Sequence, residues 1–160
     1  MGVSGGVSSM AAFNFQEDPR GGVGMEVIAE DHFAMFNAAV TALCLFMWDQ
    51  DTVQEQESID ISWYGFDIPT TVVGLLSEIL YRMESGNLVF KRFETLSLEP
   101  VDDLDERHRR KQLKISGRAY GETLDLTRHR QRFPVQAVLL PRLKVEDVAE
   151  GVRLYCVLDA

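Results

Sequence analysis

The stretch 31–50, DHFAMFNAAVTALCLFMWDQ, is apolar on almost every side when it is drawn as a helix. Its large side chains recur at helical spacing, and Asp31 stands where an N-cap residue would stand. A helix that is apolar all round has to be covered on every side. We therefore expect this helix to lie deep in the core, between a sheet and another element.

Strand and helix patterns alternate along the rest of the chain. Residues 22–30 and 52–66 alternate apolar and polar side chains as half-buried strands do, and residues 68–85 form a second, amphipathic helix. Strand patterns then follow at residues 88–99, 111–122, 135–145 and 151–159, with a charged turn at 100–110 and a hairpin turn at 148–151. This order predicts an α+β domain in which two helices pack on one face of a largely antiparallel (mixed) sheet.

The chain length indicates one domain. A chain of 160 residues can bury one substantial core. We assign residues 13–160 to this domain and the Gly- and Ser-rich residues 1–12 to a flexible leader rather than a signal peptide. No apolar stretch is long enough to span a membrane, so we expect no membrane contact, and two lone thiols in core-like segments favour a cytoplasmic location. Cys44 and Cys156 lie in apolar segments that favour buried thiols, although a disulfide stays open.

Charge is distributed unevenly along the chain. The formal net charge is −9, yet residues 107–144 carry 11 basic side chains and only two acidic ones. A basic segment in an acidic protein indicates a localised surface patch for an anionic partner. The alternative is that these side chains face solvent on strands and balance the acidic half of the chain.

Candidate site residues form two groups. A basic cluster lies between two apolar runs and is a candidate for binding an anion or a partner; its members are Arg128, His129, Arg130 and Arg132. Carboxylates at predicted strand ends are candidates for a hard-cation site; they are Asp159, Asp18 and Glu17. The sequence contains no nucleophile motif, phosphate-binding loop or zinc-binding spacing.

Several phrases of the sequence, in this order, resemble the archease family. LLSEILYRMESGNLVF at 75–90 is similar to the family's L-L-x-E-x-L-Y helix and the G-L-x-F strand after it, and residues 121–129 match its G-E-x-x-D-x-x-x-H phrase. Shorter matches are Val23-Gly24-Met25, Phe36-Asn37-Ala38-Ala39 and Val157-Leu158-Asp159-Ala160. The resemblance runs from about residue 13 to residue 160. It implies an archease-like fold, a cytosolic location and a role in assisting the ligase that seals tRNA exons.

The sequence departs from the family where the resemblance implies a metal site. The family's D-H-T-A-D segment corresponds to residues 18–22, DPRGG, so Gly22 stands where the second Asp is a metal ligand. The family's V-K-A-V-T-Y-H phrase reads VQAVLLP at 135–141, with Gln136 in place of the Lys, whereas Asp159 keeps its matched position. The resemblance therefore implies a site for Ca²⁺ or Mg²⁺ that is weakened or lost. It also adds Gln136 to the residues expected to bind an anion or a partner.

Two functions stay open from the sequence. The first is an archease-like accessory protein that assists an RNA ligase, is not itself an enzyme, and contacts the ligase or RNA through residues 107–144. The second is a divergent binding or scaffold protein on the same fold, without the metal site and without ligase activation. Stimulation of a ligase would distinguish the first function from the second, and tight binding of a divalent cation would contradict the second.

Overall fold

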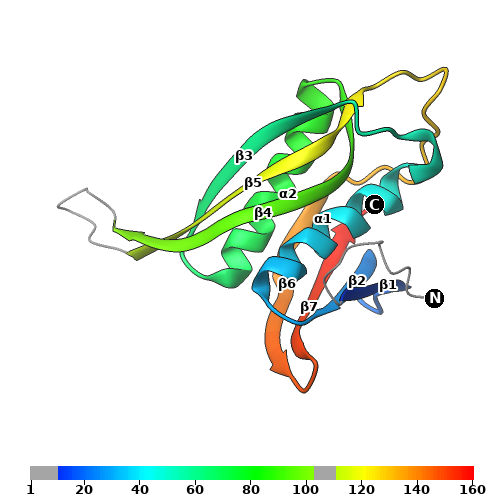
Figure 1. Cartoon of the computed structure of the whole chain (residues 1–160). Coiled ribbons are helices and arrows are strands. Elements are labelled where there is room, and N and C mark those ends of the chain that lie inside the picture. Colours follow the sequence, from blue (N-terminus) through cyan, green and yellow to red (C-terminus); the bar gives the residue numbers. More distant parts are fainter. Residues whose placement is uncertain (1–10, 103–110) are drawn as a thin grey trace.

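In the computed structural model, which describes residues 11–102 and 111–160, two helices lie between two antiparallel sheets (Figure 1). The strand order is β1-β2-β7-β6 in the four-stranded sheet and β3-β5-β4 in the three-stranded sheet. In chain order the elements are β1 Ala11–Glu17, β2 Val23–Ala29, α1 His32–Met47, the short 3-10 helix η1 Gln50–Thr52, β3 Glu57–Gly65, α2 Ile68–Ser85, β4 Leu88–Asp102, β5 Lys111–Thr123, β6 Ala137–Val148 and β7 Gly151–Asp159.

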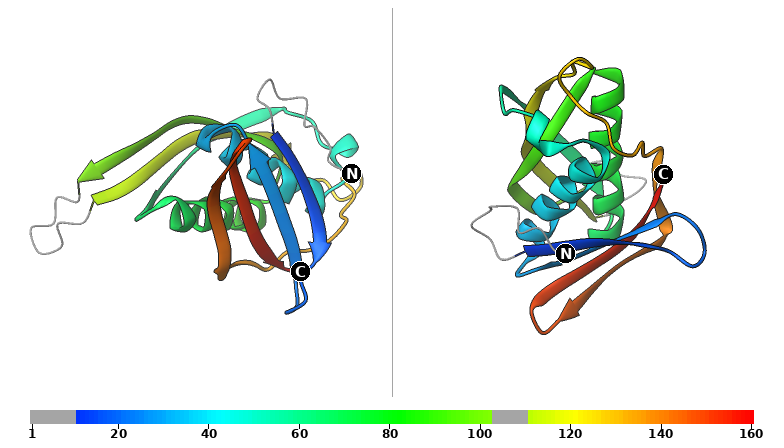
Figure 2. Two further views of the ribbon diagram at one scale, coloured as in Figure 1. Left: turned by 90° about the horizontal axis from the view of Figure 1, so that it is seen from below. Right: turned by 90° about the vertical axis from the view of Figure 1, so that its right-hand side faces the viewer.

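The helix α1 explains why the fold needs two sheets. Asp31 caps its N-terminus, as the sequence predicts, by accepting a hydrogen bond from the Ala34 N–H at 2.8 Å. The helix contacts β4 of the three-stranded sheet and β1, β2 and β7 of the four-stranded sheet (Figure 2). Its apolar side chains are thereby covered on both sides. The prediction that this helix is buried between a sheet and another element is confirmed, and the other element is the second sheet.

The helix α2 also lies between the sheets, in contact with β3 and β6. Asp67 and Thr70 form a capping box at its start, where each side chain binds the backbone N–H of the other residue, and a proline occupies the first turn. The helix ends before Asn87, whose positive φ of 53° turns the chain into β4. Its bounds are those that the sequence predicts.

The structure confirms the α+β class and the antiparallel pairing, and it divides the predicted single sheet into two. The prediction placed both helices on one face of one sheet, because the pattern of a strand does not reveal its pairing partners. Residues 11 and 12, assigned to the leader, belong instead to β1, where Phe13 and Phe15 alternate with polar residues. Residues 1–10 and the tip of the predicted charged turn, 103–110, lie outside the described residues.

Both cysteines lie in the core and are free thiols. Burial raises the pKa of the Cys44 and Cys156 thiols to about 12, which keeps them in the neutral, unreactive form. Within residues 11–102 and 111–160, neither helix has the length and apolar character that crossing a membrane would require.

Candidate functional site

The first polar cluster, which we call the Asp18 cluster, consists of Asp18, Gly21, Arg142 and Tyr155. Asp18 begins the turn between β1 and β2, and its carboxylate is only 4% exposed. It accepts hydrogen bonds from the Tyr155 hydroxyl at 2.5 Å, the Arg20 backbone N–H at 2.9 Å and Arg142 Nη1 at 3.2 Å. Tyr155 alternates along β7 with core residues, so the cluster lies on the sheet face turned away from the helices.

These contacts stabilise the ionised form of Asp18. The hydrogen bond from Tyr155, followed by that from the Arg20 backbone, lowers the pKa of the Asp18 carboxyl below its ordinary value, and the positive charges of Arg20 and Arg142 act in the same direction. The same hydrogen bond raises the pKa of the Tyr155 hydroxyl. The cluster is therefore a charge-paired unit whose carboxylate oxygens are both already bonded.

The carboxylates predicted to bind a cation do not come together as a ligand set. In the described part of the chain, no three His, Cys, Asp or Glu side chains are placed so that they could share a metal ion. Asp159 ends β7 with an exposed side chain, and Glu17 is exposed at the end of β1. The carboxylate of Asp18 is taken up by Tyr155 and Arg142. This arrangement does not fit a divalent cation, which needs several free oxygen ligands.

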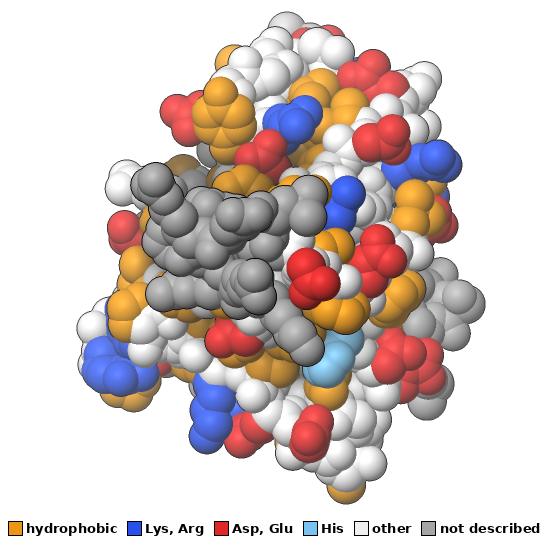
Figure 3. Space-filling model, turned by 90° about the vertical axis from the view of Figure 1, so that its left-hand side faces the viewer, with side chains coloured by type: hydrophobic (Ala, Val, Ile, Leu, Met, Phe, Trp, Pro, Cys, Tyr) orange, Lys and Arg blue, Asp and Glu red, His pale blue; other side chains and the backbone are white. Residues whose placement is uncertain are grey.

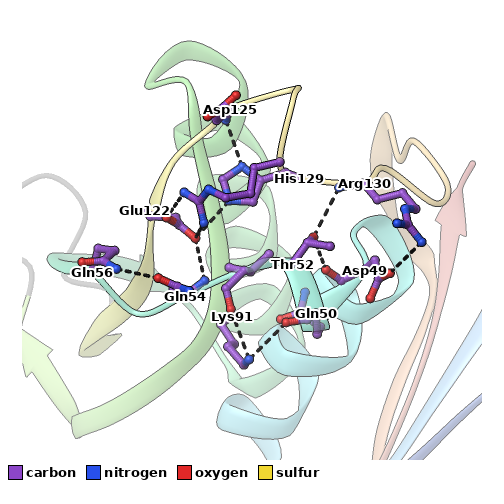
Figure 4. A network of polar contacts seen from close by, with 12 residues as sticks. Asp49, Gln50, Thr52, Gln54, Gln56, Lys91, Glu122, Asp125, His129 and Arg130 are labelled. Atoms are coloured by element: carbon purple, nitrogen blue, oxygen red, sulfur yellow. Dashed lines mark hydrogen bonds and ion pairs between the residues drawn. The ribbon is translucent and has the colours of Figure 1, made fainter.

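The second polar cluster, the Glu122 network, joins Glu122 to Arg128, His129 and the backbone of Gln54 (Figure 4). Arg128 donates to both oxygens of the buried Glu122 carboxylate as a bidentate partner. The Gln54 backbone N–H donates to the same carboxylate at 2.6 Å. Glu122 lies at the end of β5, so the network fastens the loop 124–136 to the three-stranded sheet.

His129 has a fixed structural role in this network. Its side chain is fully buried, and its Nδ1 accepts a hydrogen bond from the Asp125 backbone N–H at 2.9 Å. The Nε2 atom therefore carries the proton and donates it to Glu122 at 2.9 Å. Both His129 and Arg128 were predicted to bind an anion or a partner. In the structure both side chains instead contact Glu122 within the protein.

The loop 124–136 is also fastened to the end of α1. The Asp49 N–H donates to the Arg130 carbonyl at 2.8 Å, and the Arg132 N–H donates to the Met47 carbonyl at 2.7 Å. Figure 4 shows Asp49 and Thr52 beside Arg130, on the segment that follows α1. The backbone of the loop is thereby held from two sides, although it has no regular secondary structure.

Most basic side chains of the described part of 107–144 have a partner within the protein. Ion pairs join Arg118 to Asp60, Arg128 to Glu122, Arg130 to Asp49, Arg142 to Asp18 and Lys144 to Glu146. Arg132 donates to the Leu45 carbonyl, and Gln136 exposes its side chain while its N–H donates to the Asp159 carbonyl. On the face drawn in Figure 3, Lys and Arg side chains lie singly among acidic and apolar ones. Charge pairing within the chain thus accounts for most of the basic side chains that the structure describes in this segment.

An open pocket of about 370 Å³ lies beside the Glu122 network. Its lining includes Glu57, Asp125 and Arg128, of which Arg128 is neutralised by Glu122. The pocket is therefore acidic rather than a site for an anion.

The Glu122 network predicts a specific loss of stability in acid. Its hydrogen bonds, first those from Arg128, lower the pKa of Glu122 from 4.5 to about 2. The stabilisation by ionised Glu122 is therefore complete above pH 4.5 and is lost as the pH falls toward about 2. We expect the urea midpoint of the wild type to fall more steeply across this window than that of Glu122→Gln. In the matched control, Glu84→Gln on the exposed face of α2, the urea midpoint should fall with pH as steeply as in the wild type. An equally steep fall in all three proteins would contradict the role of Glu122.

The fold and the polar clusters define the structural class of the protein. Two antiparallel sheets that enclose two helices, with polar clusters at loop and strand ends, form a small α+β domain. This architecture is shared with the solution structure of Methanobacterium thermoautotrophicum protein 1598, with a TM-score of 0.71 and 20% identity over 92% of this chain and 98% of that one. The match shows the fold.

Comparison of the sequence with known proteins identifies the family. The model of the archease protein family (MTH1598/TM1083) matches residues 16–160, so the chain belongs to this family and the resemblance described above is confirmed. Its relatives include "Protein archease" of Methanopyrus kandleri, 31% identical over 68% of this chain and 71% of the relative. "Protein archease" of Sulfurisphaera tokodaii is 24% identical over 86% of this chain and 91% of the relative.

Proposed function

We propose that the protein is an accessory protein that assists an RNA ligase in tRNA splicing and does not itself catalyse a reaction. The observation that carries this proposal is the match of the archease family model to residues 16–160. The polar clusters agree with a role without catalysis. Asp18, Glu122 and His129 are all buried; Asp18 is bonded by Tyr155, and Glu122 by His129. These groups therefore hold the fold rather than exchange protons with a substrate.

The loop 124–136 is the surface that we propose for contact with the ligase. Leu126 is 74% exposed and Phe133 49% exposed, and the Arg130 side chain is 78% exposed between them in the sequence. Aromatic, apolar and Arg side chains are typical of protein interfaces. Because the loop backbone is already fastened to α1 and to the Glu122 network, binding would order little additional chain. Since Arg128 and Arg130 are paired with acids and Arg132 donates to a backbone carbonyl, a protein surface fits this loop better than RNA.

A ligation assay tests the proposal. The purified protein is added to the RNA ligase of its own organism with an exon-like RNA substrate, and we expect the number of turnovers per ligase to rise. The double variant Leu126→Ser/Arg130→Ala should lower the stimulation roughly tenfold or more, because interface anchors cost about 1–2 kcal/mol each. The matched control is Leu96→Ser/Arg118→Ala, which changes an exposed Leu and an exposed Arg of the three-stranded sheet.

The outcomes of this assay separate two proposals. If both double variants lose stimulation equally, loop 124–136 is not the contact surface for the ligase, although the accessory role still stands. A wild-type protein that never stimulates the ligase would leave the second function, a binding or scaffold protein on the archease fold without ligase activation. The observation that favours this second function is the Asp18 cluster, whose carboxylate is bound by Arg142 and Tyr155.

A further inference from the structure

Arg142 makes a pair of contacts that a bound cation would make. Its Nη1 atom lies 3.2 Å from the Asp18 carboxylate and 2.8 Å from the Gly21 carbonyl oxygen. One carboxylate and one backbone carbonyl, both on the β1–β2 turn, are the oxygen types that hard cations prefer. The guanidinium therefore occupies the position between these two oxygens and brings one positive charge to the buried carboxylate.

The backbone at Gly22 leaves no room for a further carboxylate in this turn. Gly22 has a positive φ of 84°, a conformation that side chains other than that of Gly rarely adopt. A Cβ atom at this position would lie 2.7 Å from Val157 Cγ1 and 2.9 Å from the Leu158 carbonyl oxygen. The turn thus provides one carboxylate, that of Asp18. Arg142 reaches this carboxylate from β6, and the exposed Arg20 of the turn itself lies 3.6 Å from it.

We propose that the Arg142 guanidinium is the built-in cation of the Asp18 cluster, so that this end of the sheet keeps its charge balance without a divalent ion. Arg142 reaches the turn from β6, at the stretch where the β6–β7 pairing shifts between Leu139 and Lys144. This irregularity frees the Arg142 backbone from regular pairing with β7. The inference concerns the protein alone and holds whether or not the protein assists a ligase.

Calcium dependence of thermal unfolding tests the inference. The wild-type Tm should be the same with a chelator and with millimolar calcium chloride at matched ionic strength. Arg142→Met leaves the buried Asp18 carboxylate with only the exposed Arg20 beside it and should lower the Tm by roughly 4–10 °C. Calcium should restore part of this loss, because the variant frees the Asp18 and Gly21 oxygens that Arg142 occupies, and water can supply the remaining ligands.

The matched control is Arg118→Met, which breaks an exposed ion pair with Asp60. Its Tm should stay close to that of the wild type and should not respond to calcium beyond the wild-type response. A wild-type Tm that rises with calcium, or an Arg142→Met Tm that calcium leaves unchanged, would overturn the inference.

A second measurement covers the case in which Arg142→Met does not fold. Arg142→Lys keeps the positive charge and should fold with a Tm that calcium does not change. Binding of Mn²⁺ to the folded wild type, followed by electron paramagnetic resonance, should equal binding to Asp18→Asn, because the Asp18 carboxylate is already neutralised. Stronger binding by the wild type would show a cation site at Asp18 and refute the proposal.

Discussion

Glu122→Ala should lower the free energy of unfolding by roughly 3–5 kcal/mol, which corresponds to a fall in Tm on the order of 10 °C for a chain of this length. The carboxylate is the shared acceptor for Arg128, the ring of His129 and the backbone N–H of Gln54. Its removal leaves buried donors without partners, and a buried donor without an acceptor costs more than the lost hydrogen bond itself. Urea unfolding at neutral pH, followed by circular dichroism, measures the change.

Two further variants locate the origin of this loss. Glu122→Gln keeps the shape and one acceptor oxygen, so its destabilisation should lie between zero and that of Glu122→Ala. Arg128→Ala should cost less than Glu122→Ala, because the Arg128 side chain is 44% exposed and water replaces part of its interaction. If Arg128→Ala is as destabilising as Glu122→Ala, the carboxylate is not the centre of the network.

Phe36→Ala should destabilise the protein by roughly 3–5 kcal/mol, the range for truncating a fully buried aromatic side chain. Phe36 lies on α1, is fully buried, and belongs to the core that the two sheets share. The surrounding sheets are held by their own hydrogen bonds, so they cannot close the cavity completely. The free energy of unfolding from urea titration gives the magnitude.

The same helix provides the control for this prediction. Phe33 lies one turn earlier on α1 and is 41% exposed. Phe33→Ala removes the same side-chain atoms from the helix but opens no cavity. The free energy of unfolding should therefore change by no more than about 1 kcal/mol. Equal destabilisation by both variants would mean that α1 is not enclosed by two sheets as the structure has it.

Periodicity predicted the local structure well, because the patterns of strands and helices depend on neighbouring residues. The bounds of α2 match the prediction, and the all-round apolar character of α1 indicated that a second layer had to cover it. The division of strands between two sheets was not predicted, since β2 pairs with β7 across more than a hundred residues of sequence. The strand β1 was missed, although Phe13 and Phe15 alternating with Asn14 and Gln16 are a signal that could have revealed it.

The site was harder to predict than the fold. The stretch 121–129 was recognised as a family phrase, but the structural role of His129 depends on Glu122 and on the backbone of Asp125 in three dimensions. The excess of positive charge in 107–144 suggested a binding surface, whereas the acidic partners of Arg130 and Arg142 are Asp49 and Asp18, far away in the sequence. A charge count along the chain cannot include such partners, because only folding brings them together.

The ion pair between Arg142 and Asp18 has a mechanical consequence for the four-stranded sheet. The strands β1 and β6 are its two opposite edges, and this contact links a turn at one edge to a side chain of the other, 124 residues apart. Edge strands ordinarily open singly, since each is held on one side only. Because loosening either edge also breaks a charged contact of the other, we expect the two outermost strands to open together rather than singly.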